Sequence, residues 1–132
     1  MPTTGEFGPR GGFGDLEYHE KVATKIGMSA ASSHESRYAA LGSPPNATQI
    51  RLSDGVFPFE ADALAPGVTV NRLLYQDIAF DAGLKIKGFS LQSEYLFRRL
   101  SEFEATGPVP QSVIKDNGFY VEAMQMVVKK KL

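Results

Sequence analysis

The stretch Phe89-Ser-Leu-Gln-Ser-Glu-Tyr-Leu-Phe-Arg98 decides the fold, because its residues alternate between two kinds of side chain. Successive side chains of a β-strand point to opposite faces, so one face here is mostly apolar and the other mostly polar or charged. Ordinary strands have about 5–6 residues, whereas a strand that crosses a bilayer needs about 9–11. The length and the alternation together predict the wall of an outer-membrane β-barrel.

Other segments of the chain alternate in a similar way. Lys87-Gly88 separates two of them and predicts a two-residue hairpin turn, because glycine adopts a positive φ at no steric cost. The first segment is the weakest, since Val22 and Ile26 are also four residues apart, as on one face of a helix. We favour a strand there over a helix. The predicted strands are 21–31, 69–86, 89–101 and 118–128.

The connections between these strands differ in length. Residues 1–20 are predicted as a turn or loop, 32–68 as a long outer loop and 102–117 as a loop, because each contains glycine, proline or asparagine turn signals. Outer-membrane barrels alternate long outer loops with short inner turns. The predicted fold class is therefore all-β: an antiparallel meander of about four long strands, part of a transmembrane β-barrel, and an open curved sheet if isolated.

Composition excludes several classes of function. The 132 residues carry 14 basic and 15 acidic side chains, so no electrostatic footprint for nucleic acid is present. Cysteine is absent, and no catalytic or phosphate-binding motif occurs, so we predict no enzyme, no cofactor and no metal. The sequence contains no run of about 20 apolar residues, so no transmembrane helix is predicted. The first residues do not resemble a signal peptide, which favours a fragment of an outer-membrane protein.

Several phrases of the sequence resemble a known family. These are 48–55, 63–70, 87–95 and 118–128, together with the strand entry at 14–19. They are similar to the later half of Gram-negative porins related to the phosphate-selective porins. The resemblance covers roughly residues 8–132, and it implies a trimeric barrel of about 16 strands in which small hydrophilic solutes or ions diffuse passively. The partners it implies are the outer-membrane lipid, the remaining strands of the barrel and two further copies of the protein. Anions such as phosphate are among the solutes it implies. The family's constriction loop and its ladder of basic residues cannot be placed on this sequence.

The polar faces of the predicted strands supply the candidate site. Charged rings along a pore tune ion selectivity, and the mixed signs found here favour weak selectivity. The competing interpretation is the wet face of any antiparallel sheet. The candidate pore-lining residues are Lys25, Asp77, Asp81, Lys85, Glu94, Arg98 and Glu122.

Two other functions stay open at this point. The first is a soluble β-rich ligand-binding module or β-sandwich domain, with a ligand held between Met124, Met126, Tyr95 and Phe97. Such a module needs its apolar face buried against another layer. The second is an enzyme subunit whose catalytic residues lie elsewhere.

Overall fold

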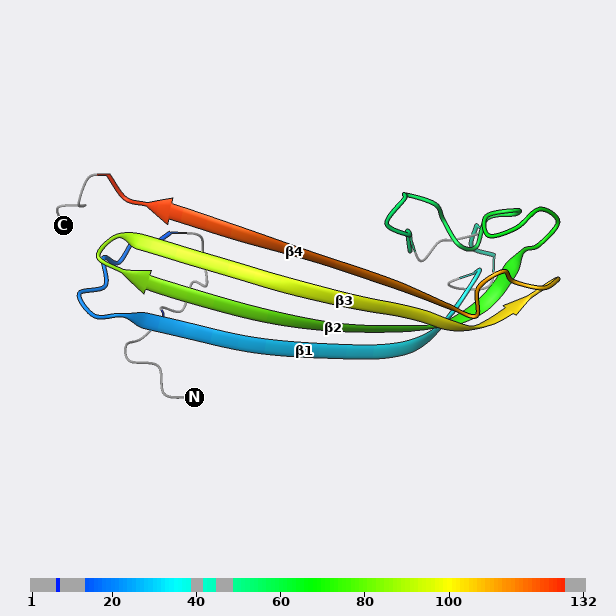
Figure 1. Ribbon diagram of the computed structural model, residues 1–132, viewed down its shortest axis with the longest axis horizontal. Helices are drawn as coiled ribbons and strands as arrows, with labels where there is room; N and C mark the ends of the chain where they lie inside the picture. The colour runs from blue at the N-terminus through cyan, green and yellow to red at the C-terminus, as the bar shows by residue number, and fades with distance from the viewer. Residues whose placement is uncertain (1–6, 8–13, 39–41, 45–48, 128–132) are drawn as a thin grey trace. The chain divides into compact units, whose positions relative to one another are not determined.

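The computed structural model describes residue 7 and residues 14–38, 42–44 and 49–127. In these residues the chain is all-β and contains no helix: it forms β1 (Ala23–Ser36), β2 (Val70–Ile86), β3 (Phe89–Ala105) and β4 (Val113–Gln125). The four strands form one sheet in the order β1-β2-β3-β4, each antiparallel to its neighbour in the chain (Figure 1). The predicted all-β antiparallel meander is confirmed, and the sheet is open, because β1 and β4 are its edges.

The chain divides into two compact units, and every strand contributes to both. The hairpin unit comprises Met1–Ser29, Ala79–Leu96 and Gly118–Leu132. The loop unit comprises Ala30–Ile78 and Phe97–Asn117. Each unit is described by itself below.

The hairpin between β2 and β3 sets the register of the hairpin unit. Lys87 and Gly88 have φ values of 47° and 81°, as the predicted two-residue turn requires. A turn of this kind pairs Ile86 with Phe89. Counting back along both strands places Asp81 opposite Glu94.

Two further contacts fix the register of the outer strands of this unit. A Cβ added at Gly27 would lie 1.9 Å from Asp81 Oδ2, so Gly27 faces Asp81 across β1 and β2. Met126 N–H donates to the carbonyl oxygen of Gly88 at 2.8 Å, which places Tyr120 opposite Glu94 across β3 and β4. Gly27, Asp81, Glu94 and Tyr120 therefore form one row across the sheet.

The loop unit contains the hydrophobic core. Phe59, from the connection between β1 and β2, packs with Val70, Leu73 and Leu100, and all four are at most 1 % exposed. Partly buried side chains surround this cluster. They are Ile50, Leu52, Leu64, Tyr75, Phe103, Ala105 and Ile114.

The alternation of β3 is interrupted next to the hydrophobic core. Leu100 and Phe103 both pack in the core although they are three residues apart. The alternation therefore shifts by one residue between them, where Glu102 has a φ of 52°. β2 shifts in the same way, since Val70 and Leu73 both pack in the core, and the hydrogen bond from Thr106 N–H to Thr69 O keeps the two strands in the register set by the hairpin.

The strands extend beyond the sequence-based bounds in three places, while β1 and β2 begin one or two residues later than predicted and β4 ends earlier. β1 continues to Ser36 through a polar run, because its backbone pairs with β2 up to the hydrogen bond from Arg37 N–H to Asn71 O at 2.8 Å. β3 continues past residue 101 to Ala105, because the shift of alternation at Glu102 hides the strand pattern in the sequence. β4 begins at Val113 rather than 118, because Asp116-Asn-Gly118, a turn signal by composition, is held in the ladder. Most of the predicted loop 1–20, part of the loop 32–68 and the last residue of the strand 118–128 lie outside the described residues.

Candidate functional site: a charged strand face

The strands of the hairpin unit separate charge onto one face. The register described above and the alternation of each strand place Lys25, Asp81, Lys85, Glu94 and Glu122 on the same side, here called the charged face. Five of the seven candidate pore-lining residues thus share a face within one unit. The side chains on the other side of these strands run from Thr24 in β1 to Gln125 in β4. Among the described residues of this unit, none of them is Asp, Glu, Lys or Arg.

This second side, here called the apolar face, is largely uncovered. Ile26, Met28, Phe119 and Val121 are 65 %, 71 %, 76 % and 62 % exposed, and Phe80 is 50 % exposed. The remaining large apolar residues of the face are Leu84, Ile86, Phe89, Leu91 and Tyr95. No layer of the described chain covers these side chains.

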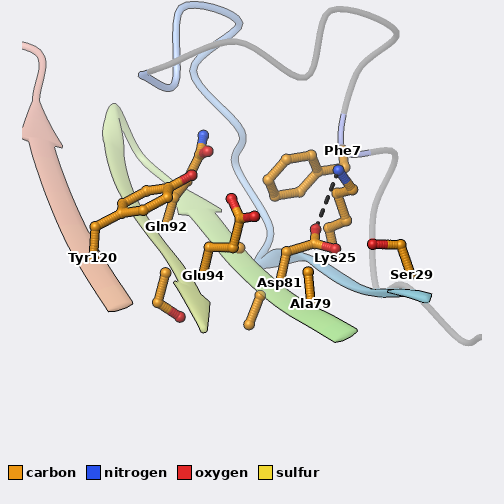
Figure 2. Close-up of a pocket in the computed structure, with 11 residues that line it drawn as sticks. Phe7, Lys25, Ser29, Ala79, Asp81, Gln92, Glu94 and Tyr120 are labelled. Carbon is orange, nitrogen blue, oxygen red and sulfur yellow. Dashed lines mark ion pairs between the residues drawn. The ribbon is translucent and has the colours of Figure 1, made fainter. Parts of the chain in front are cut away.

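The charged face contains a cavity of about 310 Å³ (Figure 2). Lys25 Nζ lies 3.3 Å from Asp81 Oδ1. In Figure 2 Glu94 lies between Asp81 and Tyr120, and a side-chain hydrogen bond links Glu94 to Tyr120. The tyrosine hydroxyl donates this bond, because an ionised carboxylate only accepts. Ser29, Gln92 and Ser93 complete the polar lining.

Lys85 differs from the other candidates, because it is only 4 % exposed. Its ammonium lies 4.5 Å from the centroid of the Phe7 ring and 3.3 Å from the carbonyl oxygen of Phe7. The ring sits where Gly83 has no side chain, since a Cβ there would approach Phe7 Cζ to 2.7 Å. Sequence reasoning missed Phe7, which lies in a glycine-rich segment without any periodic signal.

In the loop unit, Arg98 is anchored within the chain. Its Nε donates to Asp116 Oδ2 at 3.1 Å, and Ser53 Oγ donates to Asp116 Oδ1 at 2.9 Å. Asp116 was missed because Asp-Asn-Gly is a turn signal. Asp77 Oδ1 is buried and has no hydrogen-bond partner within the described part of the chain. The hairpin register places Asp77 opposite Arg98 on the neighbouring strand.

A polar anchor joins the segment before β1 to the hairpin turn. Asp15, which is 1 % exposed, accepts hydrogen bonds from the Gly88 N–H at 2.8 Å and the His19 N–H at 3.0 Å. His19 Nδ1 also contacts Asp15 Oδ1. In return, Lys87 N–H donates to His19 O at 2.7 Å. Burial disfavours the Asp15 carboxylate, but the hydrogen bonds from His19 and Gly88 and the charge of His19 outweigh it and lower the pKa of Asp15.

We expect this anchor to fail in acid and in the variant Asp15→Asn. A carboxyl group with a lowered pKa stabilises the fold above its ordinary value of 3.8 and loses that contribution as pH falls through the lowered pKa. Hydrogen bonds to a charged group contribute about 1.5–3 kcal/mol, so Asp15→Asn should lose a similar amount at pH 7. The measurement is urea unfolding between pH 2 and 8. The variant should lose part of its acid dependence in this range, because Asp116 also has a lowered pKa, and an unchanged pH profile would contradict the role given to Asp15.

Comparison with known proteins adds no family. No family model, no curated protein and no solved structure matches the chain. Within the described residues no helix is long and apolar enough to cross a membrane. The same residues contain no group of three or more His, Cys, Asp or Glu that could hold a metal ion. The resemblance to porins therefore stays a prediction.

Proposed function

We propose that this chain forms part of the wall of an outer-membrane β-barrel through which small hydrophilic solutes or ions diffuse passively. The observation that carries the proposal is the charge-free, exposed apolar face of the hairpin unit, opposite the charged face. Exposed apolar patches of this kind mark a surface that contacts something other than water. A transmembrane barrel wall has just this alternation, with apolar side chains toward lipid and polar side chains toward the lumen.

The open edges of the sheet favour a barrel that is closed by further strands. A strand edge leaves unpaired N–H and C=O groups, which are very costly in hydrocarbon. β1 and β4 are such edges in the described sheet. The partners of the chain would then be outer-membrane lipid and the remaining strands of the barrel, with a trimer as the assembly that the porin resemblance implies. In this function no bond is made or broken.

The soluble binding module is less well supported. It needs a second layer over the apolar face, yet Phe119 and Met28 are more than two-thirds exposed. It also needs Tyr95 and Met124 around one ligand. The register places Tyr95 on the apolar face and Met124 on the charged face, so these two side chains point away from each other.

The test is reconstitution of the whole protein that carries this chain into planar lipid bilayers. We expect it to require detergent for extraction and to give stepwise conductance in potassium chloride. A protein that is monomeric without detergent and gives no conductance would contradict the barrel and favour the soluble module.

A further inference from the structure

The charged face of the hairpin unit has an unequal balance of accessible charges. Asp81, Glu94 and Glu122 supply three carboxylates. Lys25 and Lys85 supply two ammonium groups, but only Lys25 is accessible, with 54 % of its side chain exposed. The five charges sum to one net negative charge, and the burial of Lys85 leaves three carboxylates but one ammonium within reach of mobile ions.

Phe7 is the residue that shields the Lys85 ammonium from mobile ions. Its ring covers the ammonium and its carbonyl oxygen accepts a hydrogen bond from it. An aromatic ring and a carbonyl oxygen stabilise a cation without adding a negative charge to the face. Gly83 provides the space for the ring, because a side chain there would collide with it.

Within the described residues, the three carboxylates of the face have one ammonium partner between them. The register places Asp81 and Glu94 directly opposite each other, and like charges in this arrangement repel. Lys25 offsets one of them through its ion pair with Asp81. The partner of Glu94 is the neutral hydroxyl of Tyr120, which donates a hydrogen bond but no positive charge.

We propose that Phe7, by covering the Lys85 ammonium, keeps it from direct contact with mobile anions, so that this section of the wall presents three carboxylates and one ammonium to the lumen and favours small cations over anions such as phosphate. The inference rests on the proposed function and concerns the field along the lumen, not a discrete binding site. Pore-lining charge sets the relative entry of cations and anions. The residues that set the preference are Glu94, Glu122 and Asp81, with Phe7 and Gly83 as positioning residues.

The test is the reversal potential of the whole protein in a planar bilayer under a potassium chloride gradient. Glu94→Gln removes one charge but keeps an oxygen that accepts from Tyr120, so the structure should persist. One unit charge about 8 Å from the path changes the local concentration of an ion about twofold, and in opposite senses for potassium and chloride, so the ratio of their permeabilities should fall about fourfold. Lys25→Gln should raise the ratio by a similar factor.

Two substitutions test the role of Phe7 separately. Phe7→Ala and Gly83→Val should both expose Lys85 and lower the permeability ratio about twofold. Gly118→Val is the matched control for the second, because no atom lies within 4 Å of a Cβ at Gly118. Glu60→Gln, in the connection between β1 and β2, controls for the loss of a carboxylate outside the strands.

The outcomes separate this inference from the proposed function. Conductance with the expected shifts supports both. Conductance with no shift in Glu94→Gln and Phe7→Ala, or with an equal shift in Glu60→Gln, overturns the charge preference and leaves the porin function standing. Absence of conductance in the unmodified protein overturns both.

Discussion

Leu91→Arg should strongly destabilise the hairpin unit in a lipid bilayer. Leu91 lies on the apolar face of β3, among side chains that carry no charge. Arginine on the lipid face of a transmembrane barrel costs about 2–4 kcal/mol near the bilayer midplane. That cost is a large fraction of the stability of an ordinary domain. The measurement is urea unfolding of the protein folded into lipid vesicles.

Gln92→Arg is the matched control for this prediction. Gln92 follows Leu91 in β3 and lines the cavity on the charged face, where an added guanidinium has carboxylates nearby. We expect a change within about 0.5 kcal/mol, as for most surface substitutions. If the two variants are equally stable, the apolar face does not contact lipid, and the soluble module becomes the better explanation.

Phe59→Ala should detach the connection between β1 and β2 from the sheet of the loop unit. Phe59 is fully buried and packs with Val70, Leu73 and Leu100. Truncation of a buried phenylalanine to alanine costs about 3–5 kcal/mol, because it removes apolar burial and leaves a cavity. The expected result is a lower free energy of unfolding and faster proteolysis within residues 49–69.

Phe57→Ala serves as the control two residues away. Phe57 is only partly buried, and Arg51 Cζ lies 4.0 Å from its ring centroid. Loss of this cation–π contact should cost about 0.5–1 kcal/mol. Similar proteolysis of the two variants would show that Phe59 does not hold the connection in place.

The candidate site could be predicted from the sequence only in part. Alternation placed Lys25, Asp81, Glu94 and Glu122 on the polar side of their strands, because side-chain direction in a strand follows from position alone. It could not show that Lys85 is buried beneath Phe7, since the two residues are 78 positions apart. Nor could it show that Arg98 is paired with Asp116, because the local turn signal of Asp-Asn-Gly gives no information about the neighbouring strand.

The bounds of the strands could also be predicted only in part from the sequence. The apolar alternation of 69–86 and 89–101 and the Lys87-Gly88 turn predicted the central hairpin closely. The polar end of β1 and the shift of alternation at Glu102 had no such signal. Both are held by hydrogen bonds to neighbouring strands, and these depend on pairing rather than on residue type.

The sequence by itself therefore determined the all-β class, the central hairpin and the separation of apolar from charged side chains, because all three follow from local periodicity and local turn chemistry. Only the tertiary structure decided which charges remain accessible and which are neutralised or buried. Those outcomes depend on the register between strands and on the return of a distant segment, Phe7 and Asp15 among its residues, onto the hairpin. Long-range contacts of this kind leave no periodic trace in the order of the residues.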